Sequence, residues 1–224
     1  SDVYKRQPLN RAAVNTVANS PFTSSEPVSE LAAGEQLFEE MELGGTVNFI
    51  AFRQAVAGYN RIKEKNKPIL TLIDFSKPST EKRFFVFDME KKKLLYSSVV
   101  AHGRNSGENY ATSFSNQYGS YKSSLGFYLT ENTYQGGNGY SLILNGLEKG
   151  INDKAKARSI VVHGAPYANP SVAASGRLGR SLGCPALPTK LARPIINTIK
   201  DGSVMFIYAN NPHYLAQSNI LHKN

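Results

Sequence analysis

Short runs of hydrophobic residues, separated by turn-forming residues, dominate the chain after Pro68. Most runs are rich in β-branched or aromatic residues, which is typical of strands in a β-rich fold. One helix is predicted near the end, over residues 189–200, and the pattern shows no regular strand–helix alternation. We predict a mainly β domain, a sandwich or open barrel, with one C-terminal helix packed on it. The predicted strands are 70–75, 84–88, 94–101, 127–130, 140–144, 159–163 and 204–208.

Two further helices are predicted before the β-rich part. Hydrophobic residues recur at helical spacing in residues 29–41, and again after Asn48, which can cap the second helix. The stretch before them is rich in Asn, Ser, Ala and Pro, which is typical of a flexible tether. We therefore divide the chain into a tether, a helical accessory segment, a β-rich domain and a tail, at residues 1–27, 28–67, 68–210 and 211–224.

Charge and composition exclude several classes of protein. The net charge is +9, but the charges are scattered, and the one compact run, Lys91-Lys92-Lys93, fits a solvated hairpin tip. No nucleic-acid-binding motif is present, so we expect no nucleic-acid partner. No apolar stretch approaches the roughly 18 residues that span a bilayer, so we expect a soluble chain without a transmembrane segment. The four dispersed histidines have no metal-site spacing, and we expect neither a metal nor a cofactor.

The chain has a single cysteine, Cys184, in the Gly- and Pro-rich segment GRLGRSLGCPALP. Arg177 and Arg180 lie just upstream, and positive neighbours favour the thiolate form. Backbone N–H groups around Leu182, Gly183 and Cys184 could converge on one point, as in an oxyanion hole. A free cysteine is also often a small buried core residue. Composition alone leaves both interpretations open.

A candidate base lies at the end of a predicted strand, where His163 is followed by Gly164. A cysteine nucleophile needs a nearby base that a third group holds in the right tautomer. The 17 residues from Gly164 to Arg180 are enough to fold the cysteine back against this histidine. No carboxylate is close in sequence, so a backbone carbonyl such as that of Gly164 would orient the ring. A structural histidine is the alternative.

The pattern His-x17-Ser-x-Gly-Cys, together with the segment HGRNSGENYATSFSN, resembles the signature of L,D-transpeptidase catalytic domains, the YkuD-like family. The resemblance extends over roughly residues 70–209. It implies that Cys184 is the acylated nucleophile, that His163 is its base, and that the carbonyl of Gly164 orients the base. By the same resemblance, Ser181, Gly183 and the amide of Cys184 form the oxyanion loop.

The resemblance also suggests where a substrate binds. The run Ser124-Leu125-Gly126-Phe127 is similar to a family strand that lines the cleft, which makes Gly126 and Phe127 candidates. His102 and Asn105 open a loop rich in Asn, Ser and Gly that suits a polar peptide or sugar, although a structural turn fits equally well.

Two departures from the family pattern affect the predicted cysteine loop. Leu182 replaces a histidine that many members carry, which puts a second loop imidazole in doubt. The continuation after Cys184 lacks the usual arginine. Substrate carboxylates would then be bound by Arg177 or Arg180, for which ordinary solvated charge is the alternative.

The function implied by the resemblance is peptidoglycan L,D-transpeptidation in cell-wall biogenesis and the control of cell shape. The enzyme would form a cysteine thioester with a tetrapeptide stem, release D-Ala and transfer the acyl group to an amine in a 3→3 cross-link. An L,D-carboxypeptidase, a protein-anchoring enzyme, a non-catalytic peptidoglycan-binding module and a cysteine hydrolase of ordinary peptides are alternatives. Peptidoglycan stem peptides would be the partners, and the location would be the bacterial envelope, periplasmic or secreted. The sequence decides neither the acceptor nor the oligomeric state.

Overall fold

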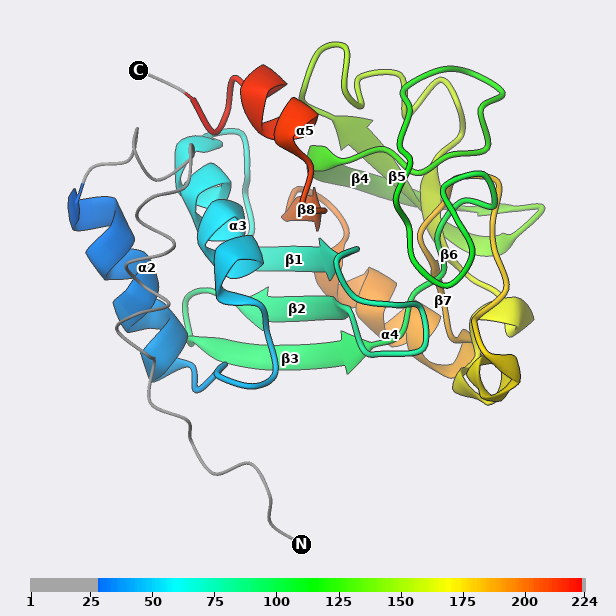
Figure 1. The fold of residues 1–224 in the computed structure, drawn as a ribbon, viewed down its shortest axis with the longest axis horizontal. Coiled ribbons are helices and arrows are strands. Elements are labelled where there is room, and N and C mark those ends of the chain that lie inside the picture. Colours follow the sequence, from blue (N-terminus) through cyan, green and yellow to red (C-terminus); the bar gives the residue numbers. More distant parts are fainter. Residues whose placement is uncertain (1–27, 223–224) are drawn as a thin grey trace, which may run out of the picture.

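Eight strands form one sheet in the computed structural model, which describes residues 28–222 (Figure 1). The strand order is β3-β2-β1-β8-β4-β5-β6-β7. A bridge between Ala101, just beyond β3, and Ala186 of β7 joins the two outer strands into a nearly closed barrel. The predicted mainly β fold of the open-barrel type is therefore confirmed. The strands are β1 Ile69–Asp74, β2 Phe84–Asp88, β3 Lys93–Ser98, β4 Gly126–Gly136, β5 Gly139–Gly146, β6 Val161–Gly164, β7 Ala186–Leu187 and β8 Val204–Tyr208.

Helices surround this barrel, and three of them were predicted from the hydrophobic pattern. Asn48 caps α3 as expected, because its Oδ1 accepts a hydrogen bond from the amide of Ile50 at 2.9 Å. The short strand β7, the two 3-10 helices and α5 were not predicted, and the predicted tether lies outside the described residues. The helices are α2 Val28–Glu40, α3 Phe49–Arg61, α4 Thr189–Ile199 and α5 Pro212–Gln217, with 3-10 helices η2 Pro166–Ala168 and η3 Pro170–Ser175.

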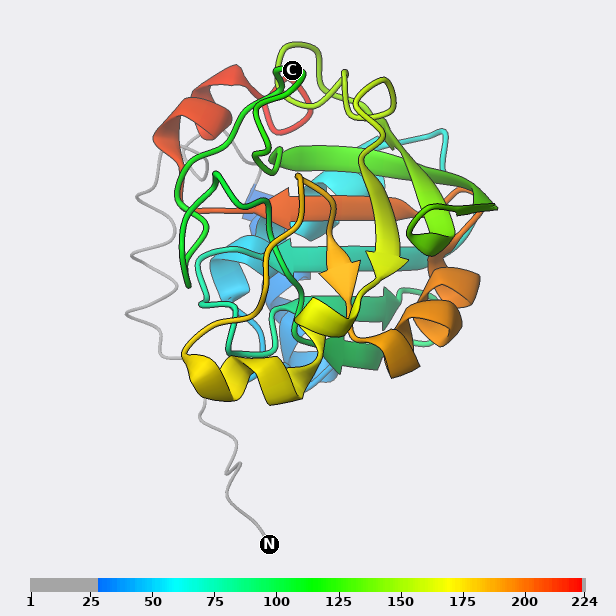
Figure 2. The same cartoon turned by 90° about the vertical axis from the view of Figure 1, so that its right-hand side faces the viewer.

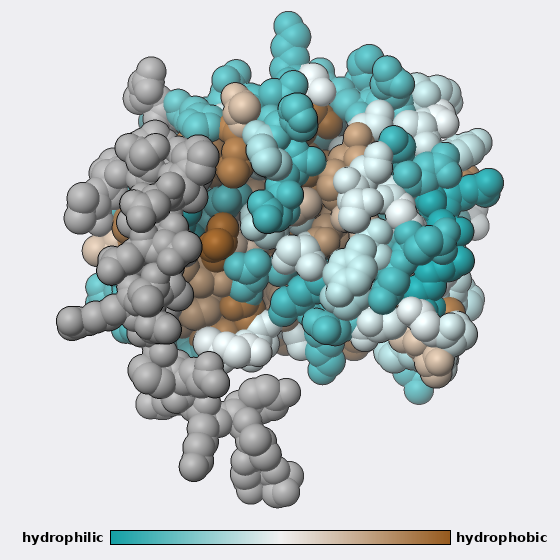
Figure 3. All heavy atoms as spheres, in the orientation of Figure 1, coloured by the Kyte–Doolittle hydropathy of each residue, from teal (hydrophilic) through white to brown (hydrophobic). Residues whose placement is uncertain are grey.

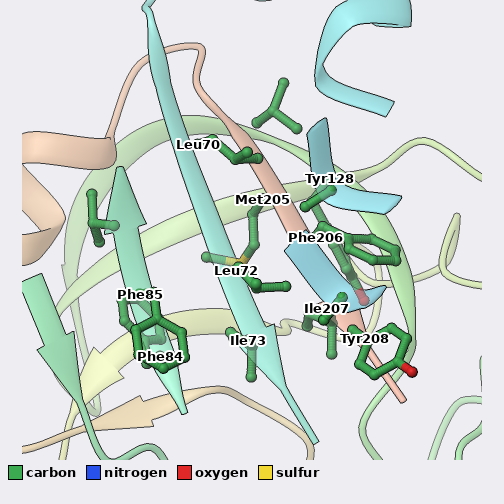
Figure 4. Close-up of a cluster of buried hydrophobic side chains, with 14 of the residues drawn as sticks. Leu70, Leu72, Ile73, Phe84, Phe85, Tyr128, Met205, Phe206, Ile207 and Tyr208 are labelled. Carbon is green, nitrogen blue, oxygen red and sulfur yellow. The ribbon is translucent and has the colours of Figure 1, made fainter. Parts of the chain in front are cut away.

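The parallel pair β1 and β8 forms the centre of the core. Every residue of both strands is buried, because α3 covers one face of this part of the sheet and α4 lies on the other (Figure 1). A strand that is buried on both faces has a nearly continuous hydrophobic sequence, as both strands do. Figure 4 shows core side chains that converge from β1, β2, β4 and β8.

The N-terminal helices share this core. Phe38 of α2 and Phe52 of α3 belong to the same buried cluster as the strands. Gly58 lets α3 approach the sheet closely, because a Cβ at this position would lie 2.0 Å from the ring of Phe127. That ring is fully buried and stacks on Phe206 with 4.2 Å between the ring centroids. The boundary between accessory segment and β-rich domain stays a prediction.

A buried carboxylate fixes the predicted tail against the barrel. Glu148 accepts hydrogen bonds from the hydroxyl of Tyr214 in α5 at 2.7 Å, and from the hydroxyl of Ser218 at 2.6 Å. It also accepts a hydrogen bond from the amide of Phe127 at 2.8 Å. Burial raises the pKa of Glu148, and these hydrogen bonds oppose that effect. Residues 212–217 thus form a packed helix within the predicted tail.

The close approach at Gly58 predicts an unusual effect of an added methyl group. At a solvent-exposed position inside a helix, replacing Gly with Ala raises the free energy of unfolding by about 0.5–1 kcal/mol. Here Gly58→Ala is expected to lower the free energy of unfolding of the protein by about 1–3 kcal/mol, because the new methyl group would overlap with the ring of Phe127. Urea unfolding measures the change. Gly137→Ala is the control, since no atom lies within 4 Å of its new Cβ, and a stabilised Gly58→Ala protein would contradict this packing.

Candidate active site

A short parallel pairing brings the two predicted reactive residues to the same part of the barrel. His163 of β6 pairs with Ala186 of β7, so Cys184, two residues earlier, reaches the level of Val161. The amide of Val161 donates a hydrogen bond to Sγ of Cys184 at 3.4 Å, and the thiol lies 3.5 Å from the carbonyl oxygen of Ser159. Figure 2 shows β6, in yellow-green, beside the short orange β7.

The His163 ring is held in one tautomer. Its Nδ1 lies 2.9 Å from the carbonyl oxygen of Gly164, which can only accept, so Nδ1 carries the proton. Nε2 then keeps its lone pair, and no group within residues 28–222 forms a hydrogen bond with it. Burial lowers the pKa of His163, which favours the neutral ring that a general base requires. The His163–Gly164 contact that the resemblance implied is present, whereas their catalytic role stays a prediction.

The thiol of Cys184 is largely buried, with 8% of the residue exposed. Burial raises the pKa of this thiol, while the hydrogen bond from Val161 and the positive charge of Arg158 oppose the rise. No hydrogen bond joins Sγ to the His163 ring in the described part of the chain. Burial of both groups favours a neutral thiol–imidazole pair as the resting state.

The prediction that Arg177 and Arg180 place positive charge beside the thiol of Cys184 is wrong. Arg177 and Arg180 pair with Glu108, at 2.9 and 3.3 Å, and Arg180 also donates to the carbonyl of Arg104 at 2.8 Å. They therefore connect the cysteine loop with the loop after β3. Their predicted binding of a substrate carboxylate stays a prediction, and in this structure a protein carboxylate occupies both guanidinium groups.

Ser181 organises the loop that ends at the cysteine. Its hydroxyl donates to the carbonyl of Cys184 at 2.6 Å and accepts from the amide of Gly183 at 3.1 Å. The amide of Gly183 is thus occupied, which contradicts its predicted role as an oxyanion donor. Within residues 28–222, the amides of Leu182 and Cys184 donate no hydrogen bond and remain the candidate donors. The Leu182 residue is 56% exposed.

Only glycine fits at position 183. Its φ is +127°, in the region that L side chains rarely adopt. A Cβ there would also lie 2.7 Å from the Ile160 side chain and 3.0 Å from the carbonyl of Lys122. The glycine lets the loop pass between two neighbouring segments immediately before Cys184.

The prediction that His102 binds substrate is wrong. The residue is 1% exposed, and both ring nitrogens have partners. Arg83 donates to Nδ1 at 2.8 Å, and the protonated Nε2 donates to the carbonyl of Gly107 at 3.0 Å. Burial, followed by the charge of Arg83, lowers the pKa of His102 to about 4. The carbonyl of His102 accepts from the amide of Ser181 at 2.9 Å, so this histidine supports the cysteine loop from behind.

The other predicted substrate contacts divide into two groups. Asn105 is exposed, and its side-chain amide donates to the carbonyl of Ser120 at 3.0 Å, so its role stays a prediction. Gly126 and Phe127 are buried and cannot line a cleft. A Cβ at Gly126 would lie 2.5 Å from the carboxylate of Glu148. The start of β4 resembles the family pattern in sequence, but Glu148 packs against Gly126 and α3 packs against Phe127.

A groove borders the backbone that holds the thiol. Residues paired across neighbouring strands direct their side chains to the same face, so Tyr134 and His163, both in line with Ser141, share one face of the sheet. Ile143 pairs with Val161 on this face as well. The groove has a volume of about 290 Å³ and is lined by Tyr134, Ile143, Lys156, Ser159, Ile160 and Val161. Sequence reasoning missed it because its residues come from three separated segments.

Within residues 28–222, no group of three or more His, Cys, Asp or Glu side chains is arranged to hold a metal ion. In the same range, no helix combines the length and the apolar character needed to cross a membrane.

A family model described as L,D-transpeptidase catalytic domain matches residues 44–208. The matched range begins inside the predicted accessory segment and includes β1 through β8. Among curated proteins, no relative matches this chain.

Several solved structures are similar at low sequence identity. An L,D-transpeptidase from Mycobacterium smegmatis has 15% identity and a TM-score of 0.39, with 63% of this chain and 59% of that chain covered. L,D-transpeptidase 3 from Mycobacterium tuberculosis has 14% identity and a TM-score of 0.42, with coverages of 63% and 61%. An L,D-transpeptidase from Stackebrandtia nassauensis has 13% identity and a TM-score of 0.37, with coverages of 90% and 89%. The matched regions thus span about three fifths of the first two proteins.

The buried His102 predicts a loss of stability in mild acid. Its pKa is about 4 in the folded protein and near 6.5 in an unfolded chain. The unfolded chain therefore binds more protons between these values, and stability falls as pH decreases through this window. We expect His102 to account for about 2 kcal/mol of loss between pH 7 and pH 5.

Urea unfolding of wild type and His102→Gln at both pH values isolates this contribution. The variant is expected to lose about 2 kcal/mol less than wild type between the two conditions. His213→Gln, at an exposed position on α5, is the matched control and should follow wild type. Equal losses in wild type and His102→Gln would show that the histidine is not held neutral.

Proposed function

This chain belongs to the family of L,D-transpeptidase catalytic domains, and on this basis we propose that it is a peptidoglycan L,D-transpeptidase with Cys184 as nucleophile and His163 as base. One observation supports this most strongly: β6 and β7 pair in parallel, and the thiol contacts the strand that carries a histidine with a free Nε2. A nucleophile, a base and a carbonyl that orients the base are the components of a cysteine acyltransferase.

The first half of the proposed reaction releases D-Ala. The Cys184 thiol transfers its proton to Nε2 of His163 as the sulfur attacks the carbonyl of the third stem residue. The amides of Leu182 and Cys184 donate to the oxyanion that forms. The carbon–nitrogen bond then breaks, D-Ala leaves with the proton from His163, and a thioester on Cys184 remains.

In the second half an amine of another stem attacks the thioester. His163 takes the proton of the amine and returns it to the leaving sulfur, which restores the thiol and yields a 3→3 cross-link. Water as the acceptor would give an L,D-carboxypeptidase instead. Chromatography of products from a tetrapeptide, with and without an acceptor stem, distinguishes a dimer from a tripeptide.

The surroundings of the pair suit a peptide substrate. The groove beside Ser159 and Val161 has an apolar wall and one ammonium group, that of Lys156. The side of the molecule formed by the long loops between β3 and β4 is mainly hydrophilic or neutral (Figure 3). Such a surface suits hydrogen bonding to peptide and sugar groups. Because peptidoglycan lies outside the cytoplasm, we also propose a location in the cell envelope.

A non-catalytic peptidoglycan-binding module is the second candidate. It is favoured by the 8% exposure of Cys184 and by the absence, within residues 28–222, of a hydrogen bond between its thiol and His163. Binding of a tetrapeptide without release of D-Ala would support this alternative.

The nucleophile is tested by acylation with a carbapenem. Intact-mass spectra of wild type are expected to show one covalent adduct, because the chain has one cysteine. Cys184→Ala is expected to show none, since no thiol remains to attack the lactam ring. Ser175→Ala, an exposed position on η3, is the control and should acylate like wild type. Acylation of the Cys184→Ala protein would exclude this cysteine as the nucleophile.

The neutral resting pair predicts a broad pH profile for acylation. Burial lowers the pKa of His163 and raises that of Cys184. In a base-assisted attack the acid limb reports the imidazole and the alkaline limb reports the thiol. The acid midpoint is therefore expected below the ordinary value of about 6.5, and the alkaline midpoint above about 8.5. Stopped-flow acylation rates between pH 4 and pH 11 test this, and an acid midpoint above 7 would contradict it.

A further inference from the structure

Arg158 lies in the turn before β6 and has no role in the mechanism above. We propose that Arg158 is a positioning residue, which fixes the loop beside the nucleophile and whose charge favours the thiolate of Cys184. The inference rests on the proposed function for its catalytic meaning. Its effect on the thiol can be measured without any turnover.

The guanidinium group is fixed by four hydrogen bonds. Nη1 donates to the carbonyl of Ser115 at 3.0 Å and to the hydroxyl of Ser124 at 2.8 Å. Nη2 donates to the hydroxyl of Ser120 at 3.0 Å and to the carbonyl of Lys122 at 2.9 Å. These acceptors span ten residues of the long loop between β3 and β4, so one side chain holds that loop at four points.

The same guanidinium lies against the cysteine loop. Nη2 is 3.5 Å, and the carbonyl of Lys122 is 3.0 Å, from the point where a Cβ on Gly183 would stand. Arg158 is also followed directly by the segment that holds the thiol, since Ser159 and Val161 both contact Sγ. Movement of the guanidinium would therefore disturb both sides of the nucleophile.

The positive charge is not neutralised by an acidic side chain. Within residues 28–222, no carboxylate lies within ion-pair distance of Arg158, and its acidic neighbours are Tyr128 and Cys184. Half-burial weakens screening by water and salt, so the charge acts on the thiolate more strongly than a surface charge would.

The other titratable groups around the thiol do not replace this charge. His163 is disfavoured as a cation by burial. Tyr167 is acidic, and burial together with the nearby Cys184 raises its pKa to about 12. The ammonium of Lys122 donates to the hydroxyl of Ser113 at 2.6 Å, within the long loop. Arg158 is the cation that opposes the rise in the pKa of Cys184.

Alkylation of the single cysteine by iodoacetamide gives a direct test. Because the chain has one cysteine, whole-protein mass spectra report Cys184 alone. The rate is measured against pH, and its midpoint gives the pKa of the thiol. Arg158→Gln, which keeps hydrogen-bonding groups but no charge, is expected to raise the midpoint by about half a unit or more. Arg158→Met is a second charge-free variant, should the first fail to fold.

Two further variants separate charge from packing. Arg158→Lys keeps the charge without the four-point geometry, so its midpoint is expected near that of wild type. Its acylation by a carbapenem should nevertheless be slower, because the long loop is held at fewer points. Arg177→Gln removes an arginine that pairs with Glu108, and its midpoint is expected to remain that of wild type.

The proposed role of Arg158 is overturned if a folded charge-free variant keeps the wild-type midpoint. It is also overturned if Arg177→Gln shifts the midpoint as much as the charge-free Arg158 variants do. A shifted midpoint restored by Arg158→Lys supports it. Should wild type alkylate with the expected pattern but never acylate, the proposed function fails while the role of Arg158 at the thiol stands.

Discussion

The parallel pairing of β6 with β7 is the constraint on which the candidate site depends. β7 has only two residues, yet it holds residues 184–187 against the strand that carries His163. The bridge from Ala101 to Ala186 and the bridge from Gly103 to Ser181 secure the other side of the same segment. The contacts that close the barrel are therefore also the contacts that form the candidate site.

Buried polar groups hold the cysteine loop in place through a chain of hydrogen bonds. The guanidinium of Arg83 donates to the ring of His102, whose carbonyl in turn holds Ser181. Ser181 closes the turn around Gly183 and Cys184 with its hydroxyl. A buried polar network in which each member has a partner specifies one geometry more strictly than apolar packing does. Burial also raises the pKa of the Cys184 thiol and lowers that of the His163 imidazole, which favours the neutral form of both groups.

Much of the fold could be predicted from sequence, because runs of hydrophobic residues between turns are a strong signal. β2 and β8 have the predicted bounds, and the capping of α3 by Asn48 is present. β4 and β5 are longer than predicted because their hairpin continues into polar, partly exposed residues. β7 could not be predicted, since two residues between prolines carry no periodicity.

In the candidate site, features formed by residues near each other in sequence could be predicted, whereas features formed by residues distant in sequence could not. Spacing and resemblance predicted that residues 163 and 184 would come together, because both lie in one continuous segment. The pairing of β6 with β7 brings Cys184 to the level of Val161, and the approach of its thiol to the His163 ring stays a prediction. Arg158 was missed because its partners are 34 to 43 residues away in the chain. Phe127 was assigned to a cleft because a strand pattern does not reveal that α3 covers that face. Arg177 and Arg180 were expected at the thiol because they are near it in sequence, although both side chains extend to Glu108.

The most direct test of this account is the identification of the covalent intermediate formed with a tetrapeptide stem. Wild-type protein is incubated with the donor, quenched in acid and digested, and the peptides are mapped by tandem mass spectrometry. The account predicts the stem without its terminal D-Ala, attached as a thioester to the peptide that contains Cys184. Release of D-Ala with the acyl group on another residue, or with no covalent intermediate under rapid quenching, would contradict it.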